Sequence, residues 1–595
     1  MTHAEIFGDA QWIEADESIQ IPVFRKPFSV GKVKQAQINI IGLGVFALFL
    51  NGKRVSNDLL VPVVSDYHER KFAVNGLPFD EVLGHRMYVC RYDVTEYLRQ
   101  DENVLAVMLG PAWYADKQHF TFGRMKLCFR LTYTDEAGEH VVISDESMRC
   151  NRSFVIDSTL LQGEKHNYFE EQEGWKDPGF DDSHWHTSSL AKAPKTEFYM
   201  QECPPDREIR TITPKFMGER NGLRLYDLGE NISGYVVLQS KGGDHVGDAT
   251  VTMSEELMPD GSLDPLRGFG QKLEYIVGYA KKELRPYFTW QAFRYFEVWG
   301  DVDVVDCRVV HTDAAVTSRF ESSSEVLNWL NDAYIRTQLC NMPMGIPSDC
   351  PHAERKGYTG DGQLTCEAAM VMLDSRKFYE KWIADVADCQ DRITGHVQYT
   401  APYNNAGGGP GGWGCAIVVV PYMYYKQYGD KEMLRNLYDP MLKYLGYLKD
   451  HSENNLVVSD RKNGWCLVTG APQRRQRFPN LLSIPISLSR VLTIFWRSGR
   501  SSDVWNIRMH CFHCGKNCAK PLPAHTLMLQ PVTSRVTTKV LMPMRWISVW
   551  VMSGHLPIWF VIIKNWVCTI PVFLAQIFLP GSCLKRERRR WRMTC

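Results

Sequence analysis

The chain is organised around one stretch, Asp349-Cys350-Pro351-His352-Ala353-Glu354-Arg355-Lys356-Gly357-Tyr358-Thr359-Gly360-Asp361, which holds three carboxylates in thirteen residues. Pro351, Gly357 and Gly360 disfavour a continuous helix, so we predict a loop between a helix ending near Cys340 and another beginning after Asp361. Acidic residues grouped with an aromatic ring are suited to binding a sugar and to protonating a glycosidic oxygen. The alternative interpretation is a solvated acidic turn.

This stretch resembles the active-site signature of the bacterial α-L-rhamnosidases, glycoside hydrolase family 78. In that signature an Asp-Cys-Pro start is followed by Glu-Arg, then Gly, an aromatic residue and Thr-Gly-Asp. The resemblance runs from about Phe24 to Leu467. It departs from the family at His352, where many members carry Arg, and it ends after Leu467.

The resemblance implies roles for individual residues. Glu354 falls on the family's general acid, which must hold a proton near neutral pH, and negative charge on Asp349 and Asp361 would favour that proton. The two Asp residues fall on positions that hydrogen-bond rhamnose hydroxyls. Tyr358 takes the place of an aromatic residue that packs on the sugar, and His352 is expected among the substrate-binding residues.

Trp413 is a second candidate platform for the sugar. It follows six residues, 407–412, of which five are glycines that let the backbone approach closely. A core aromatic residue at the start of a helix is the alternative for Trp413.

The second carboxylate of the reaction is predicted to be absent. The family inverts configuration, which needs a base roughly 6.5–9.5 Å from the acid to activate water. In the family this base is a Glu in the later half of the barrel. Here that part of the chain offers only Glu587, inside a basic cluster.

The pattern of apolar residues predicts a multidomain chain with antiparallel β-sandwich domains first. Alternating segments and frequent turns between about Phe24 and Thr196 indicate β structure, including an apolar run from Ala36 to Leu50 that ends at the hairpin signal Asn51-Gly52. A second β unit resembles the family's concanavalin-like domain. We expect domains at 1–200, 201–314 and 315–467, followed by a tail at 468–595.

After Phe320 the apolar period becomes helical. Ser322 and Glu325 form a predicted capping box, and further helices are expected at 362–373, 376–391, 415–428 and 431–450. The resemblance implies an (α/α)6 barrel of six helical hairpins, of which this chain shows less than half. We therefore expect the apolar faces of 362–373 and 415–428 to remain partly in water.

Residues 468–595 differ sharply in charge from the rest. They hold 19 Lys and Arg but only two acids, so the formal net charge of +0 hides a first part with a net charge of −17. Val468-Thr469-Gly470 stand where the family continues with Gly-Asp-Trp, and their codons read one base earlier can spell Gly-Asp-Trp. We predict that 468–595 are frame-shifted and poorly ordered, and that the chain as written is inactive.

The tail also carries motifs that invite other interpretations. The segment from His510 to Cys518 has zinc-like ligand spacing, Leu556 to Ile563 is apolar but too short to span a bilayer, and Lys585 to Arg592 is typical of nucleic-acid or anionic-surface binding. Out-of-frame sequence carries no selected sites. We therefore expect no metal, no nucleic acid and no membrane partner.

The sequence as a whole predicts an inverting α-L-rhamnosidase that removes terminal α-L-rhamnose from a glycoside or polysaccharide without a cofactor. A non-catalytic carbohydrate-binding protein built on the two β units is the alternative. Seventeen irregularly spaced cysteines, and a start without the basic and apolar segments of a signal peptide, indicate the cytoplasm. A periplasmic location, the natural aglycone and the oligomeric state stay open.

Overall fold

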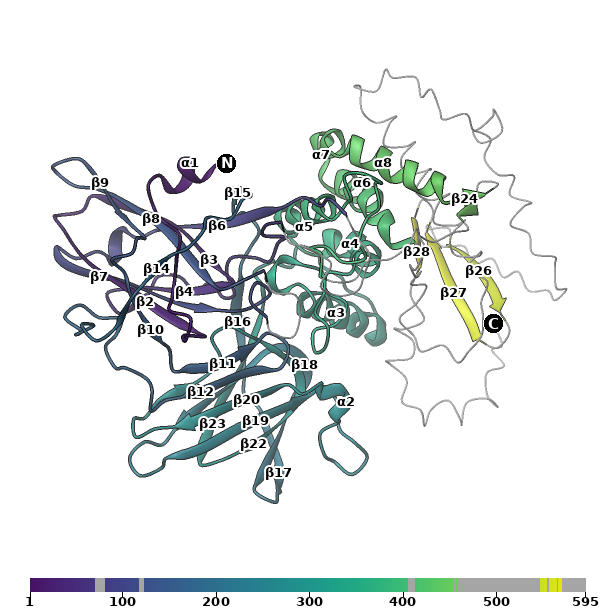
Figure 1. Cartoon of the computed structure of the whole chain (residues 1–595). Helices are drawn as coiled ribbons and strands as arrows, with labels where there is room; N and C mark the ends of the chain where they lie inside the picture. The colour runs from purple at the N-terminus through teal and green to yellow at the C-terminus, as the bar shows by residue number, and fades with distance from the viewer. Residues whose placement is uncertain are drawn as a thin grey trace. The chain divides into compact units, whose positions relative to one another are not determined.

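The computed structural model describes residues 1–69, 81–116, 122–404 and 412–453, together with the backbone of short strands at 456–457, 546–553, 556–563 and 566–569. The chain divides into two compact units, Met1–Asn506 and Ile507–Cys595. Within the first unit, β-strands are followed by helices, as Figure 1 shows. This order confirms the predicted fold class.

Two sheets form the N-terminal β-sandwich. The first has the order β14 (Ser189–Leu190), β1 (Ile13–Glu14), β8 (Lys126–Thr134), β3 (Gln35–Leu43), β6 (Arg86–Asp93), β15 (Glu197–Met200), with β9 (Glu139–Ile143) paired to β8. The second has the order β13 (His186–Thr187), β10 (Arg149–Arg152), β2 (Pro22–Val30), β7 (Asp101–Gly110), β4 (Val45–Leu50), β5 (Lys53–Arg54). Their pairs are antiparallel except β6 with β15, which run parallel.

The core of this sandwich lies between its two sheets. Ile38, Ile40 and Phe129 of the first sheet and Phe24 and Val107 of the second are fully buried in one cluster. Such interdigitating inner faces are the usual source of stability in a β-sandwich.

The predicted hairpin at Asn51-Gly52 is confirmed. Both residues have positive φ, +52° and +82°, as a two-residue type I′ turn requires, and β4 pairs with β5 across them. The long apolar run before the turn forms two strands in different sheets, β3 and β4. Gly44 lies between them, where a Cβ would lie 2.2 Å from the Pro111 carbonyl oxygen.

A third sheet carries the second β unit. Its order is β11 (Val155–Thr159), β12 (Gly163–Asn167), β20 (Lys272–Val277), β19 (Gly247–Ser254), β22 (Gln291–Trp299), β18 (Leu223–Ser240), β23 (Val302–Thr312), β16 (Asp206–Ile212), with β17 (Lys215–Arg220) and β21 (Glu283–Leu284) paired to β18. The first two strands precede residue 200, and β12 runs parallel to β20. The domain boundaries remain predictions.

The helices of the first unit are α1 (His3–Phe7), α2 (Pro265–Gly268), α3 (Glu325–Cys340), α4 (Thr359–Met372), α5 (Arg376–Asp388), α6 (Ala416–Tyr428), α7 (Lys431–Asn436) and α8 (Tyr438–Asp450), as far as the structure describes the chain. The single helix predicted at 431–450 is therefore two helices, α7 and α8, which are interrupted at Leu437. Pro440 lies in the first turn of α8, where a missing N–H does no harm.

The capping box at Ser322 and Glu325 is not formed, so this prediction was wrong. Helix α3 begins at Glu325 with Ser324 at the N-cap, which makes no side-chain bond to the helix. Ser322 is engaged elsewhere, since its hydroxyl accepts from the Ser324 N–H and its own N–H donates to Asn328.

Several apolar side chains of the described helices are exposed. Leu364 and Val371 of α4 are 59% and 43% exposed, which confirms the expectation for 362–373, and Val326 of α3 is 69% exposed. The expectation for 415–428 was wrong, because α6 packs against α4, α5, α7 and α8 and buries most of its apolar residues.

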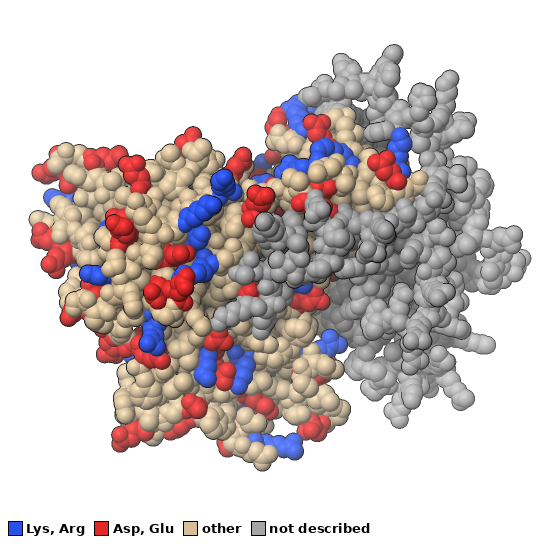
Figure 2. All heavy atoms as spheres, in the orientation of Figure 1, with Lys and Arg blue, Asp and Glu red and all other residues tan. Residues whose placement is uncertain are grey.

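The second unit contains one antiparallel sheet of three strands in its described part: β26 (Trp546–Ser553), β27 (Leu556–Ile563) and β28 (Trp566–Thr569). The segments His510 to Cys518 and Lys585 to Arg592, and most of the predicted frame-shifted tail, lie outside the described residues. None of the described helices is long and apolar enough to cross a membrane. On the visible face of the first unit, acidic and basic side chains are interspersed (Figure 2).

Candidate active site

The predicted loop and the start of α4 together carry the three acids. Asp349 and Glu354 lie on the loop, but Asp361 lies in the first turn of α4, which begins at Thr359 and not after Asp361 as predicted. A tertiary contact explains the difference, since the Thr359 N–H donates to the Tyr399 carbonyl at 2.8 Å. Gly360 is thus part of a helix rather than a break in one.

The loop is closed by hydrogen bonds across its base. The Asp349 N–H donates to the Lys356 carbonyl at 3.2 Å, and the Lys356 N–H donates to Asp349 Oδ1 at 3.1 Å. The Ala401 N–H donates to the Gly357 carbonyl at 2.9 Å. A Cβ at Gly357 would lie 2.3 Å from the Ala401 carbonyl oxygen, so only glycine allows this approach.

Glu354 is the accessible acid of the group. Its side chain is 48% exposed, and Lys356 Nζ lies 3.8 Å from its Oε2. The Tyr358 hydroxyl donates to the same oxygen at 2.5 Å. Burial and the contact with Glu354 raise the pKa of the Tyr358 phenol, so this hydroxyl keeps its proton and remains a donor.

The other two acids are partly buried. Burial, followed by the negative charge of Glu354, raises the pKa of both Asp349 and Asp361 to about 6. The Cys350 thiol also donates to Asp349 Oδ2 at 3.1 Å. The structure therefore brings the three acids within electrostatic reach of one another, a cluster of the kind found at functional sites. Their individual roles remain predictions.

We expect Asp361→Asn to raise the melting temperature at pH 7.5 but hardly at pH 4. A carboxyl with a folded pKa of about 6, above its ordinary 3.8, supports folding below pH 4 and loses that contribution as the pH rises through 6. The neutral amide removes this penalty, which corresponds to about 1–3 kcal/mol. Thermal melts of both proteins at the two pH values measure it.

Asp227→Asn is the matched control, and its expected sign is opposite. The paired Arg294, 2.8 Å away, lowers the pKa of Asp227, so this carboxylate stabilises the fold at neutral pH and the amide should lower the melting temperature there. An equal gain from Asp361→Asn at pH 4 and pH 7.5 would show that its charge is not the cause.

Trp413 lies beside the acid cluster. It belongs to a short 3-10 helix, Gly412–Cys415, and its ring is 5.4 Å from the Tyr358 ring and 5.3 Å from the Tyr399 ring. The Gln363 side chain donates to the Gly412 carbonyl at 2.8 Å and so fixes this turn to α4. Trp413 is half-buried, so it serves as packing and also borders the predicted sugar site.

We expect Gly360→Ala to destabilise the protein by about 1–3 kcal/mol, the usual cost of overpacking. A Cβ at Gly360 would lie 2.5 Å from Trp413 Cδ2 and Cε2. Gly446→Ala in α8 is the control, because its Cβ would meet nothing within 4 Å and alanine favours a helix by about 1 kcal/mol. Thermal melts should show a lower melting temperature for Gly360→Ala and a higher one for Gly446→Ala. A higher melting temperature for Gly360→Ala would refute the close packing.

His352 faces the third sheet. Its Nδ1 lies 3.3 Å from Glu255 Oε2, and its ring is 6.4 Å from that of Phe269. Burial, then the charges of Arg267 and Arg355, lower the pKa of His352 to about 4, so the imidazole is neutral at pH 7. Its contacts are with protein groups, and a direct role in sugar binding remains a prediction.

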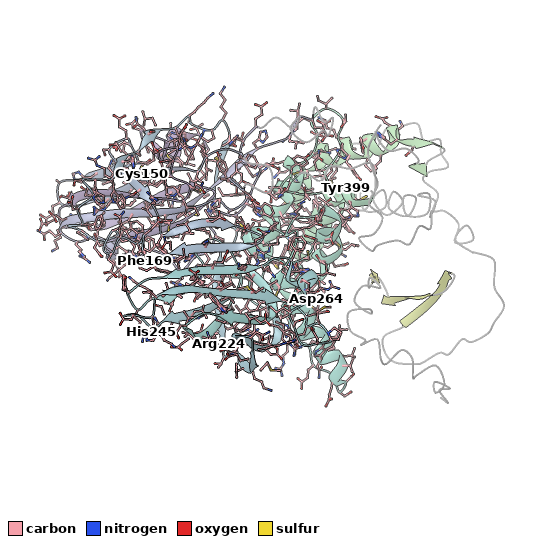
Figure 3. The ribbon with its side chains drawn as sticks, turned by 60° about the horizontal axis from the view of Figure 1, so that its bottom comes forward. Cys150, Phe169, Arg224, His245, Asp264 and Tyr399 are labelled. Atoms are coloured by element: carbon pink, nitrogen blue, oxygen red, sulfur yellow. The ribbon has the colours of Figure 1, made fainter. Side chains whose placement is uncertain are left out.

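Two participants were not foreseen from the sequence. Tyr399, labelled in Figure 3, supplies the carbonyl that starts α4 and a ring against Trp413. Arg355 is fully buried instead of lying among the acids. Tyr399 does not stand out by spacing or composition, and the position of Arg355 in the signature does not indicate where its side chain lies.

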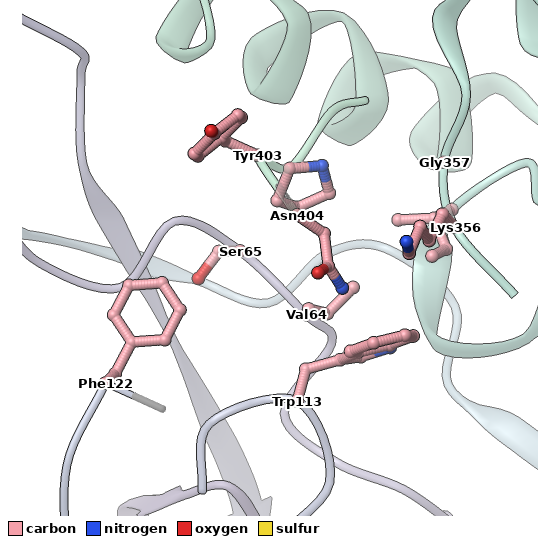
Figure 4. Close-up of a pocket in the computed structure, with 10 residues that line it drawn as sticks. Val64, Ser65, Trp113, Phe122, Lys356, Gly357, Tyr403 and Asn404 are labelled. Carbon is pink, nitrogen blue, oxygen red and sulfur yellow. The ribbon is translucent and has the colours of Figure 1, made fainter. Parts of the chain in front are cut away.

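A small pocket lies next to the loop (Figure 4). It is lined on one side by Val64, Trp113 and Phe122 of the N-terminal part, and on the other by Lys356 and Asn404 among others. Among the residues that the structure describes, no group of three or more His, Cys, Asp or Glu side chains could hold a metal ion.

Family models match most of the first unit. Residues 31–75 and 78–210 match the alpha-L-rhamnosidase N-terminal domain, residues 219–318 the bacterial alpha-L-rhamnosidase concanavalin-like domain, and residues 315–477 the bacterial alpha-L-rhamnosidase 6 hairpin glycosidase domain. The last match reaches slightly beyond Leu467, where we predicted the resemblance to end.

Individual relatives agree with these matches. An alpha-L-rhamnosidase of Streptomyces avermitilis is 31% identical over 468 residues, which cover 75% of this chain and 43% of that protein. The chain spans about half the length of the curated relatives it matches.

Two solved structures resemble the chain. The alpha-L-rhamnosidase of Dictyoglomus thermophilum aligns with a TM-score of 0.74 at 27% identity and covers 83% of this chain and 57% of its own. The Streptomyces avermitilis enzyme, solved with L-rhamnose, aligns with a TM-score of 0.71 at 27% identity and covers 81% of this chain and 46% of its own.

Proposed function

Because the chain belongs to the bacterial α-L-rhamnosidase family, we propose that the Glu354 loop is the acid half of a site that hydrolyses terminal α-L-rhamnose from glycosides or polysaccharides. The observation that carries this proposal is the grouping of one half-exposed carboxyl, Glu354, with the partly buried carboxyls of Asp349 and Asp361 beside an aromatic pair.

In this proposal Glu354 donates a proton to the glycosidic oxygen as the bond to the anomeric carbon breaks. The Tyr358 hydroxyl occupies Oε2, which leaves Oε1 to carry the transferable proton. Asp349 and Asp361 accept hydrogen bonds from rhamnose hydroxyls. Trp413 and Tyr358 offer rings to the apolar face of the sugar, which 6-deoxy sugars enlarge with a methyl group.

The other half of the reaction is an attack by water on the opposite face of the sugar. An inverting enzyme activates this water with a second carboxylate, roughly 6.5–9.5 Å from the first, which takes its proton. Between residues 468 and 595 the only acids are Asp503 and Glu587. We propose that neither serves as this base and that the chain as written does not complete the reaction.

A shifted reading frame after Leu467 accounts for this loss. Codons for Val468-Thr469-Gly470 can spell Gly-Asp-Trp, the family's continuation, when they are read one base earlier, so we infer that restoring one deleted base would make this change. The acid-poor composition begins at the same place. We refer to the protein with that change as the frame-restored protein.

Release of nitrophenol from para-nitrophenyl α-L-rhamnoside by the frame-restored protein tests the proposed activity. We expect turnover without added metal or cofactor. Binding of rhamnose without any turnover would refute the enzyme and support a carbohydrate-binding protein instead.

We also propose a cytoplasmic location. The ten cysteines in the described part form no disulfide with one another, and nine of them are buried, which fits a reducing compartment. Cell fractionation tests this, and recovery of the protein in a periplasmic extract would contradict it.

A further inference from the structure

Arg355 directly follows the proposed acid, yet its side chain points away from water. It is 1% exposed. Its backbone has a φ of +52°, a left-handed conformation that residues other than glycine adopt only at a cost in free energy. The surrounding structure must therefore hold this residue in place.

The guanidinium of Arg355 joins the loop to the β part of the molecule. Nε donates to the Pro351 carbonyl within the loop at 2.7 Å. Nη1 donates to the Leu160 carbonyl, between β11 and β12, and Nη2 donates to Gln271 Oε1 at 2.9 Å, just before β20. The guanidinium carbon also lies 4.5 Å from the centre of the Trp290 ring.

The two acceptors on the β side are themselves held in place. The Thr289 hydroxyl donates to the same Leu160 carbonyl at 2.8 Å. The Gln271 side chain accepts from the Ala292 N–H at 2.7 Å and donates to the Ala292 carbonyl at 2.9 Å. Arg355 therefore binds to fixed points on two segments, which are separated from it by 195 and 84 residues in sequence.

No carboxylate neutralises Arg355 in the described part of the chain, where every hydrogen-bond partner is a neutral oxygen. Burial accordingly lowers the pKa of Arg355 to about 9. A buried cation without a counter-ion is costly, so its presence next to Glu354 calls for a reason other than stability.

We propose that Arg355 is a positioning residue that fixes the Glu354 loop on the third sheet, so that the β unit forms the support of the active site and not a separate binding module. This inference rests on the proposed function. The three hydrogen bonds of Arg355 that hold the loop, here called the clamp, can be tested without any activity.

Only arginine suits this place. Its planar fork directs three N–H groups at three separate carbonyl-type oxygens while its face stacks on Trp290, whereas a lysine ammonium is a single point that cannot span them. Arg355→Lys should consequently fail to replace it.

Peptide-resolved hydrogen exchange on the full 595-residue chain tests the clamp. In Arg355→Lys and Arg355→Met we expect the amides of Asp349, Lys356 and Ala401, which close the loop, to exchange at least tenfold faster. Addition of millimolar methylguanidine to Arg355→Ala should restore part of the protection, a rescue that a general loss of packing would not show.

Arg25→Met is the matched control. Arg25 is 2% exposed, stacks 5.3 Å from the Phe180 ring and donates to the Asp177 and Phe180 carbonyls, so it is as buried as Arg355. Unlike Arg355 it also pairs with a carboxylate, Asp182, at 2.7 Å. It should speed exchange near 177–182 and leave the 349–362 loop unchanged.

Unchanged loop exchange in a folded Arg355→Met, or full protection in Arg355→Lys, would overturn the proposal. If Arg355→Met does not fold, Gln271→Leu removes one acceptor and should loosen the same loop, whereas an effect confined to 268–292 would also overturn it. In the frame-restored protein, Arg355→Lys should lower kcat more than it raises KM. Absence of all activity in the frame-restored protein with Arg355 intact would refute the proposed function and leave the exchange result standing.

Discussion

Glu354→Gln is expected to lower the turnover of the frame-restored protein on methyl α-L-rhamnoside by about 10²–10⁴-fold, the usual contribution of a general acid. Glutamine keeps the shape of Glu354 and an oxygen that can accept from Tyr358, but it has no proton to transfer. The side chain is half-exposed, so the fold should not change. Initial-rate kinetics should show the loss in kcat, with KM nearly unchanged.

The leaving group provides the internal check on this prediction. Nitrophenolate departs with little help from an acid, so the same substitution should cost much less on the para-nitrophenyl substrate. Glu321→Gln, at an exposed position before α3, is the control and should leave both rates intact. Losses below about fivefold on both substrates would remove Glu354 from the role of general acid, given the expected range.

The 595-residue chain as written is expected to release no measurable rhamnose, whereas the frame-restored protein does. Under our proposal the written chain lacks the carboxylate base that an inverting mechanism needs. It also leaves Val326 and Leu364 in water, and each large apolar side chain left uncovered forgoes roughly 1.5–3 kcal/mol against a total stability of about 5–15 kcal/mol.

Resequencing of the locus belongs with that assay. We expect the bases to show a one-base change near codon 468. Bases that confirm Val468-Thr469-Gly470 in frame, together with cooperative melting and rhamnosidase turnover of the 595-residue product, would contradict our interpretation of residues 468–595.

Local signals predicted the features that local physics controls. The Asn51-Gly52 hairpin followed from turn chemistry alone, because positive φ at both positions admits few residue pairs. The grouping of Asp349, Glu354 and Asp361 followed from their spacing and from the family signature. In each case the feature was predicted from residues within one short segment.

The predictions that were wrong failed because of tertiary contacts. Helix α4 starts at Thr359 because the Tyr399 carbonyl, 40 residues away in sequence, accepts its N–H, and no pattern within 349–361 records that partner. Helix α6 is buried because α5, α7 and α8 surround it, so its apolar face is covered even without further hairpins. Arg355 is buried because two of its three acceptors, at Leu160 and Gln271, lie beside strands of the third sheet that are distant from it in sequence. A cation within an acidic loop is expected to meet the acids when only the sequence is known.

The most direct test of the central claim is proton NMR of methyl α-L-rhamnoside during hydrolysis by the frame-restored protein. The anomeric proton of the first product identifies its configuration before mutarotation mixes the two forms. We predict that β-L-rhamnose appears first, at a rate that Glu354→Gln suppresses. No release of rhamnose, or α-L-rhamnose as the first product, would contradict an inverting α-L-rhamnosidase with Glu354 as its acid.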